Sequence, residues 1–370
     1  MKKKWGIAIS LLALTGSSAS FAQSNVTVSG IVDLGVGRFT GNGTGVNAND
    51  KAATRVENGG MTFSRLVFAG SEDLGKGNSV SFELSTFIRA DTGAAGRADA
   101  IGAPLNLGAD PLFARASWIG FTNSDYGRIR LGNATTLLFI NAINSNAFGD
   151  STVYSPLILT TFVGGPLSGG TGWNNQVVYN SPIISGFSVW AAATASEGLG
   201  RNRALRGVYG NGPLNASVVW QDVQKTPQTF ADGTTLTHTR TWLAAASYDF
   251  GFVKVYGNLG QIVNRGTDAA PLDVHYKLAE VSASVPAGAG AFLVGYAQRK
   301  TDDPVAPVPG GAPAGNIERK VFTLGYDYFL SKRTDMYAMA MRDSTQTNTL
   351  PGATVKAHAT NFGVGIRHRF

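Results

Sequence analysis

The feature of this sequence that most constrains its fold is a two-residue alternation of apolar and polar side chains that recurs along the chain. Such a period places successive side chains on opposite faces of a β-strand. The last segment has one face made of Phe362, Val364, Ile366, His368 and Phe370 and another made of Asn361, Gly363, Gly365, Arg367 and Arg369. The pattern predicts sixteen strands, near residues 25–39, 60–70, 78–90, 112–123, 126–134, 173–181, 186–196, 202–210, 213–223, 238–249, 252–263, 274–285, 290–300, 317–329, 333–343 and 356–370.

The connections between these strands sort into two classes. Those after even-numbered strands are short, at 74–77, 123–125, 182–186, 211–213, 250–251, 286–290 and 331–332. Those after odd-numbered strands are mostly long, at 40–59, 91–111, 135–172, 224–237, 264–273, 301–316 and 344–355. An up-and-down barrel in an outer membrane has short periplasmic turns and long external loops, whereas a water-soluble sandwich has no reason to sort its connections in this way.

Composition agrees with a closed membrane barrel. The chain has 47 glycines, no cysteine and 10% aromatic residues, and its mean hydropathy is zero. Without cysteine an exported chain has no disulfide framework. We therefore predict an all-β fold, a 16-stranded antiparallel transmembrane β-barrel in one domain at 23–370. A barrel of this size encloses an aqueous lumen.

The first residues read as a targeting segment. Lys2, Lys3 and Lys4 precede a short apolar run, and Ala22 ends a small-residue cleavage pattern. This predicts a secretory signal peptide at 1–22, cut after Ala22, with an uncleaved anchor as the alternative. Its removal lowers the net charge from +7 to +4, because the segment holds three lysines and no acid. That balance does not indicate nucleic-acid binding, and none is expected.

Many aromatic residues fall near the predicted strand ends, where lipid-facing rings form interfacial girdles. In a soluble sandwich the same residues are core residues. We expect girdles made of Trp118, Tyr126, Tyr179, Trp190, Trp220, Trp242, Tyr248, Tyr256, Tyr296, Tyr326, Tyr328 and Tyr337.

Strand alternation also predicts which arginines face the lumen. Arg65 is inward if Leu66 and Phe68 face lipid, and Arg128 and Arg130 are inward if their apolar neighbours face lipid. Arg115 is inward if Ala116 and Trp118 are outward. These arginines are candidates for a basic pore wall, and their alternative role is structural pairing with an acid across the wall. Further candidates for the lumen wall are Glu83, Asp33 and Arg89.

The long segment at 134–172 is the candidate constriction, and it is nearly neutral. Between Thr135 and Trp173 the only acidic or basic side chain is Asp150. Asparagines surround it. The loop side of the constriction is therefore predicted at Asp150, Asn144 and Asn146.

Several segments together resemble the trimeric general porins of β-proteobacteria, the Neisseria, Bordetella and Comamonas type. They are VTVSGIVD at 26–33, SRLVFAGSEDLG at 64–75, YGRIRLG at 126–132, VVYNSP at 177–182, YDFG at 248–251, LSKRTDMY at 330–337 and GIRHRF at 365–370. The resemblance implies a homotrimer whose third external loop folds into the lumen. It also implies basic wall positions at Arg65, Arg115 and Arg130, and an assembly signal at Phe370 read by the barrel-assembly machinery. Val178 stands where relatives often have arginine, which lowers the expected anion selectivity.

We therefore expect a water-filled channel for ions and small hydrophilic solutes, with weak to moderate anion preference. The expected partners are membrane lipid, lipopolysaccharide, small anions and two further copies of the chain; no cofactor or metal is expected. The alternatives are a channel specific for a sugar, carboxylate or aromatic acid, a closed adhesive barrel, and a barrel hydrolase. Catalysis is not expected, because the four histidines are dispersed and no nucleophile or metalloprotease motif occurs.

Overall fold

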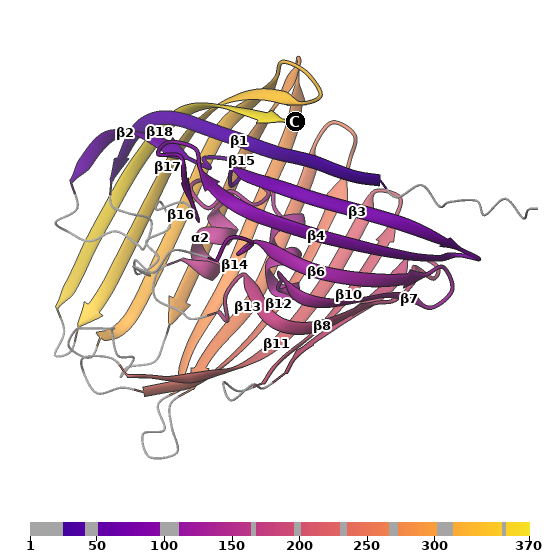
Figure 1. Ribbon diagram of the computed structural model, residues 1–370. Helices are drawn as coiled ribbons and strands as arrows, with labels where there is room; N and C mark the ends of the chain where they lie inside the picture. Colours follow the sequence, from indigo (N-terminus) through magenta and orange to yellow (C-terminus); the bar gives the residue numbers. More distant parts are fainter. Residues whose placement is uncertain are drawn as a thin grey trace, which may run out of the picture.

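The computed structural model describes residues 25–40, 51–96, 111–163, 168–195, 201–229, 235–265, 273–301, 314–349 and 353–370. The expected signal peptide at 1–22 lies outside these residues. The described strands form one antiparallel sheet, which closes because the first strand pairs with the last, Ile31 opposite Arg369 and Arg38 opposite Phe362 (Figure 1). The strands are β1 (Asn25–Thr40), β2 (Ala52–Asn58), β3 (Arg65–Gly75), β4 (Asn78–Arg89), β5 (Ala94–Ala95), β6 (Ala116–Asn123), β7 (Gly127–Thr135), β8 (Gly172–Asn180), β9 (Phe187–Thr194), β10 (Asn202–Asn211), β11 (Leu214–Thr229), β12 (Thr235–Asp249), β13 (Lys254–Arg265), β14 (Val274–Ala287), β15 (Gly290–Thr301), β16 (Ala314–Phe329), β17 (Thr334–Thr349) and β18 (Thr354–Arg369).

These strands make a wall of 16, as predicted. β2 and β3 together form one wall strand, because both pair with β1 on the same edge. β5 is not a wall strand, since its two residues pair only with the end of β4. The short connections, such as Gly75 to Asn78 between β3 and β4, all lie at the end of the barrel where the described chain begins and ends. This confirms the predicted alternation of turns and loops.

The second predicted strand, 60–70, needs correction. Residues 59–64 leave the sheet between β2 and β3, and the backbone N–H groups of Met61 and Thr62 donate to the Asp33 carboxylate at 2.8 and 2.7 Å. Tyr337 on β17 donates its hydroxyl to the same carboxylate at 2.7 Å. Asp33 is buried. A buried acceptor thus replaces the ladder hydrogen bonds that a continuous strand would make.

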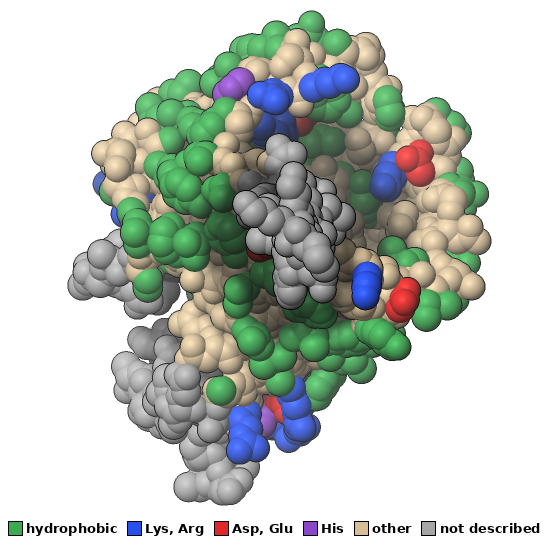
Figure 2. Space-filling model, turned by 45° about the vertical axis from the view of Figure 1, so that its right-hand side comes forward, with side chains coloured by type: hydrophobic (Ala, Val, Ile, Leu, Met, Phe, Trp, Pro, Cys, Tyr) green, Lys and Arg blue, Asp and Glu red, His purple; other side chains and the backbone are tan. Residues whose placement is uncertain are grey.

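The wall strands have an exposed outer face and a largely buried inner face. On β18 the predicted outer residues Phe362, Val364, Ile366 and Phe370 are exposed, whereas Arg367 is buried. Apolar side chains cover much of the outer surface in view (Figure 2). Lipid removes the apolar side chains of this face from contact with water, which stabilises the barrel in the way that burial stabilises the core of a soluble protein.

The girdle prediction was correct for most of the aromatic residues and wrong for four. The outer face exposes Tyr126, Tyr179, Trp220, Trp242, Tyr248, Tyr296 and Tyr328. Tyr326 is half-buried and shares that face with Leu324 and Tyr328. The four wrong residues lie on the inner face, because each is opposite a polar or buried residue of the adjacent strand. They are Trp118, Trp190, Tyr256 and Tyr337. An aromatic ring with a polar edge suits either face, so position near a strand end did not decide its direction.

Candidate functional site

The connection between β7 and β8 contains two short helices, α1 (Leu137–Asn144) and α2 (Pro156–Phe162). Thr136 caps α1 by accepting a hydrogen bond from the N–H of Phe139, and Ser155 caps α2 by accepting one from the N–H of Ile158. Serine or threonine before the first turn satisfies donors that have no partner inside the helix. Among the described residues, neither helix is long or apolar enough to cross a membrane.

The first part of this connection is attached to the inner face of β10 to β14. Arg206 on β10 donates from Nε to Asn141 Oδ1 at 2.9 Å. Ser145 donates its hydroxyl to Asn258 Oδ1 on β13 at 2.9 Å, and Asn258 donates in turn to Glu280 on β14 at 2.6 Å. These side chains are buried, so each bond replaces one that water would otherwise make.

The second part is attached to β15 and β16 through the C-terminal end of α2. Arg319 donates from Nη1 to the carbonyls of Leu159 and Val163 at 2.9 and 2.7 Å. Arg299 donates to the carbonyls of Thr160 and Val163 at 3.1 and 3.2 Å. The last carbonyls of a helix carry partial negative charge and have no partner within it, so two guanidinium groups there stabilise the helix end.

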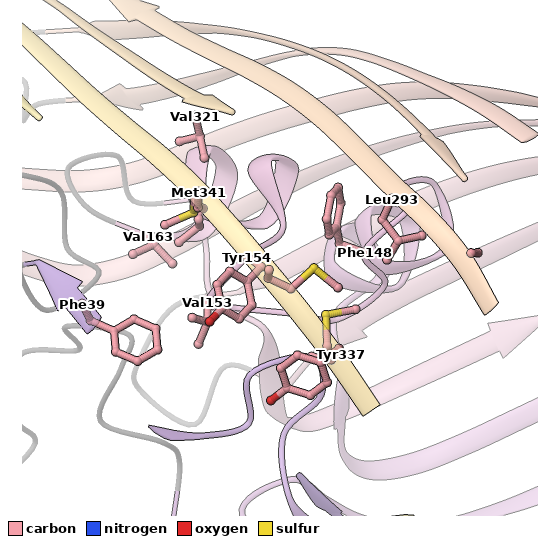
Figure 3. Packing of buried hydrophobic residues seen from close by; sticks show 13 residues of the cluster. Phe39, Phe148, Val153, Tyr154, Val163, Leu293, Val321, Tyr337 and Met341 are labelled. Atoms are coloured by element: carbon pink, nitrogen blue, oxygen red, sulfur yellow. The ribbon is translucent and has the colours of Figure 1, made fainter. Parts of the chain in front are cut away.

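Apolar packing completes the attachment (Figure 3). Tyr154 and Phe148 from the connection lie in one buried cluster with Phe39, Tyr337 and Met341 from the wall. Tyr154 packs edge-on against Tyr337, with 6.4 Å between ring centres. Glycines on the wall leave room for these rings: a β-carbon at Gly295 would overlap Phe148, and one at Gly363 would overlap Tyr154.

Asp150, between the two helices, contacts the opposite part of the wall. Its carboxylate lies 3.1 Å from Arg65 Nη1 on β3 and accepts a hydrogen bond from the Thr62 hydroxyl at 2.8 Å. Arg367 on β18 donates to that hydroxyl at 3.0 Å. The one acid of the connection therefore forms an ion pair with Arg65.

Arg115 and Glu83 form a second ion pair on the same inner face, with 2.6 Å between Nη1 and Oε1. Burial lowers the pKa of the Arg115 guanidinium, and the nearby charge of Arg65 lowers it further, while Glu83 and Asp150 raise it. The premise of the Arg115 prediction was wrong, because Ala116 is buried and Trp118 is on the inner face. Arg115 reaches Glu83 from the residue before β6, where strand alternation no longer applies.

Arg128 and Arg130 on β7 stack against Trp118. Their guanidinium carbons lie 4.6 and 5.3 Å from its ring centre, which is the range of cation–π attraction. Gly120 lies opposite Arg130 in the register, and a β-carbon there would collide with the Arg130 side chain. Within the described part of the chain, neither arginine has an ion-pair partner within 4 Å.

The other predicted site residues have varied surroundings. Asn144 is exposed, but Asn146 is buried and uses its amide within the connection, donating to the carbonyls of Ala142 and Gly149. Asn146 therefore holds the connection together instead of lining its surface. Asp33 is buried beneath residues 59–64, and Arg89 is half-buried at the loop end of β4. Phe370 is exposed, with its backbone paired to Gly30.

The sequence reasoning did not single out three arginines that contact the connection: Arg206, Arg299 and Arg319. Each sits on the inner face of its strand, with an exposed apolar or charged neighbour beside it, as Leu205 beside Arg206. Alternation therefore contained a signal for their direction. Their partners in the connection, backbone carbonyls and Asn141, did not show in any charge pattern.

No group of three or more potential metal ligands occurs among the described residues. The described histidines are dispersed, with His238 on β12, His275 on β14, and His358 and His368 ten residues apart on β18.

Comparisons with known proteins agree on one family. A family model described as Gram-negative porin matches residues 8–348. An outer membrane porin protein of Bordetella pertussis is 27% identical, with full coverage of both chains. Outer membrane porin protein 32 of Delftia acidovorans is 27% identical over 98% of this chain and 99% of its own. Among solved structures, an anion-selective porin from Comamonas acidovorans is similar with a TM-score of 0.73 and 23% identity, over 94% of this chain and 100% of its own. This last likeness shows the fold.

Proposed function

The chain belongs to the Gram-negative porin family and is an outer-membrane channel for passive diffusion. We propose that its narrowest part lies between the β7–β8 connection and two arginines of the wall, Arg65 on β3 and Arg115 just before β6. The connection folds into the lumen in this proposal. The observation that carries it is the attachment of one short segment to wall strands on both sides: to Asn258 on β13 at one point and to Arg65 on β3 at another.

We propose a weak to moderate preference for anions. Arg65 and Arg115 each have an acidic partner, Asp150 and Glu83, so those two pairs nearly cancel. Arg128 and Arg130 lie on the same face, and no acid of the described residues is within ion-pair distance of either. Fixed positive charge beside a low-dielectric wall raises the local concentration of anions. The anion-selective relative from Comamonas supports this direction.

Three further parts complete the proposal: the first and the last rest on the family, and the second rests on the residues at 2–22. The chain forms a homotrimer, its leader is cleaved after Ala22, and Phe370 is read by the barrel-assembly machinery. The exposure of Phe370 at the end of β18 supports the last of these, because an unassembled C-terminal strand would present that ring to a receptor.

One observation favours a second candidate function, a channel selective for aromatic or carboxylate solutes. Trp118 lies on the inner face with a guanidinium group near its ring from both Arg128 and Arg130. A ring and two cations offer a planar anion both stacking and charge-assisted hydrogen bonds. Such a site would saturate with solute, whereas a general channel would not.

Single-channel recording in a planar bilayer distinguishes the general channel from the solute-selective channel. An ohmic current that favours chloride over potassium in a salt gradient, and that solute does not saturate, supports the general channel. Saturation or block by micromolar benzoate, lost in Trp118→Ala, supports the second candidate. A cation preference contradicts the assignment of the arginines, and an absent current contradicts an open lumen.

A further inference from the structure

Residues 59–64, which leave the sheet between β2 and β3, form a short segment on the inner face of the wall. We call it the inward segment. All of its residues are buried. Gly59 has a φ of +76°, in the region that favours glycine, and a β-carbon at Gly60 would overlap Tyr337 on β17. The inward segment is therefore shaped to fit closely against the wall.

Asp33 on β1 fixes the inward segment to the wall through its backbone as well as its side chain. Gly59 donates its N–H to the Asp33 carbonyl at 2.9 Å, and the Asp33 N–H donates to the Ser64 hydroxyl at 3.0 Å. The N–H groups of Met61 and Thr62 donate to the Asp33 carboxylate. Because the backbone is held on both sides of Thr62 and at Thr62 itself, the position of that side chain is set.

The inward segment also contacts the β7–β8 connection. Ser151 donates its hydroxyl to the Gly60 carbonyl at 2.7 Å, and Thr62 donates its hydroxyl to Asp150 Oδ1 at 2.8 Å. Met61 lies in the buried cluster that includes Tyr154 of the connection. The inward segment thus lies between the wall and the connection, at the point where the connection has its one charge.

Arg367 on β18 determines the direction in which the Thr62 hydroxyl donates. Its Nη1 donates to the hydroxyl oxygen at 3.0 Å, and its guanidinium group is held by Asp335 at 2.9 Å and by Asp327 at 3.1 Å. A hydroxyl has one proton. Since Arg367 occupies a lone pair of the oxygen, the proton is directed at Asp150.

The Asp150 carboxylate therefore has a separate donor for each of its oxygens. Thr62 donates to Oδ1, and Arg65 donates to Oδ2 at 3.1 Å. Both donors belong to the wall side of the contact, so together they hold the carboxylate toward the wall. With a donor on one oxygen only, the carboxylate would turn its free oxygen toward water, because an ionised oxygen without a hydrogen bond is costly.

We propose that Thr62 is a positioning residue for the ion selectivity of the channel, and that through it the inward segment holds the charge of Asp150 beside Arg65 and away from the water of the lumen. If the carboxylate turns toward the lumen, its charge acts on permeating ions from a shorter distance and the anion preference falls. The inference rests on the proposed function, which places Asp150 at the constriction. It adds that the inward segment sets how strongly this charge acts.

Thr62→Val tests the inference, because valine has nearly the shape of threonine but no hydroxyl. The assay is the reversal potential in a potassium chloride gradient across a planar bilayer. The anion-to-cation permeability ratio should fall about twofold, the effect of a unit charge that moves from roughly 7 Å to roughly 5 Å from the ion path in water at about 0.1 M salt. Thr62→Ser keeps the hydroxyl and should keep the parental ratio. Each variant that conducts has assembled, so a folding defect is not mistaken for a change in selectivity.

Thr323→Val is the matched control. Thr323 on β16 donates its hydroxyl to the carbonyl of Tyr154 in the connection at 2.8 Å. This variant therefore removes an equivalent hydrogen bond between wall and connection without a contact to Asp150, and the permeability ratio should stay at the parental value. An equal fall in Thr323→Val would refute the positioning role, because it would indicate a general loosening of the connection.

A double variant shows whether Thr62 acts through Asp150. Thr62→Val/Asp150→Asn should have the same ratio as Asp150→Asn alone, since no carboxylate is left to turn. An additive change in the double variant would refute the inference. An unaltered or raised ratio in Thr62→Val, with a clear shift in Asp150→Asn, would also refute it and would leave the proposed function in place. An unaltered ratio in both single variants would refute the inference together with the proposed constriction.

Discussion

Replacement of Asp150 by asparagine should make the channel more selective for anions. Asp150 is the one acid of the β7–β8 connection, and it opposes Arg65 at 3.1 Å. Asparagine has nearly the same shape and can still accept the hydrogen bond that Thr62 donates. The substitution therefore removes one negative charge from the proposed constriction while the connection keeps that contact with the wall.

The expected size follows from Coulomb's law with screening. A unit charge roughly 7 Å from a permeating ion contributes about 0.3 kcal/mol in water at 0.1 M salt, and about twice that beside a low-dielectric wall. Anions gain this energy and cations lose it, so the anion-to-cation permeability ratio should rise roughly three- to eightfold. At 1 M salt the Debye length falls to about 3 Å, and most of the effect should vanish.

The assay is the reversal potential across a bilayer that separates two potassium chloride concentrations. Asp125→Asn is the matched control, since Asp125 lies exposed in the turn between β6 and β7 and carries the same charge. It should change the permeability ratio little. An unaltered ratio in Asp150→Asn, or an equal change in both variants, would refute the placement of Asp150 at the constriction. Asp150→Ala loses the Thr62 contact as well, and should add current noise to the same change in selectivity.

Three further predictions concern stability and assembly. Asp33→Ala should lower the free energy of unfolding by roughly 3 kcal/mol, because the N–H groups of Met61 and Thr62 and the Tyr337 hydroxyl lose a buried acceptor. Urea unfolding followed by tryptophan fluorescence measures this free energy, and a change near zero contradicts the prediction. Arg319→Met should cost roughly 3–5 kcal/mol, because it leaves Asp343 buried without its partner. Arg319→Met/Asp343→Leu should recover part of that loss in the same unfolding experiment, because it removes the unpaired acid but not the loss of the donor to the carbonyls of Leu159 and Val163. Phe370→Ser should reduce the yield of assembled barrel in cells while its unfolding stays near that of the parent, since Phe370 is exposed; an equal loss of stability would assign the residue a structural role instead.

The wall could be predicted from the sequence because every wall strand meets two different environments. Each strand has water or polar side chains on its inner face and lipid on its outer face, and this imposes a period of two on its sequence, as on β18. The alternation of short turns and long loops then gives the up-and-down order of the strands. The interruption at 59–64 was not predictable in this way. It depends on a hydrogen bond between Asp33 and Tyr337, 304 residues apart, and no local pattern records such a contact.

The two helices did have a local signal. Ser155 followed by Pro156 is a typical helix start, but a seven-residue helix has too few residues for a period of 3.6 to emerge. The sequence indicated the charged residues of the wall more completely than the residues that hold the β7–β8 connection against the wall. Alternation and the family resemblance both indicated Arg65, whereas Arg115 rested on the resemblance alone once its alternation premise proved wrong. Arg319 contacts the connection through carbonyl groups, which every residue has.

The β7–β8 connection is nearly free of charged side chains because of the way it packs against the wall. Its two helices are buried against the wall, and burial of an unpaired charge there would cost several kcal/mol. The wall supplies the charges instead: Arg299 and Arg319 bind the carbonyl end of α2, and Arg206 binds Asn141. An acid added to α2 would compete with those carbonyls for the same guanidinium groups. The one charge of the connection, Asp150, lies between the helices, where its side chain is partly exposed and meets Arg65. In the proposed constriction, the connection would set the width of the channel by its packing, and the arginines of the wall would set the sign of its field.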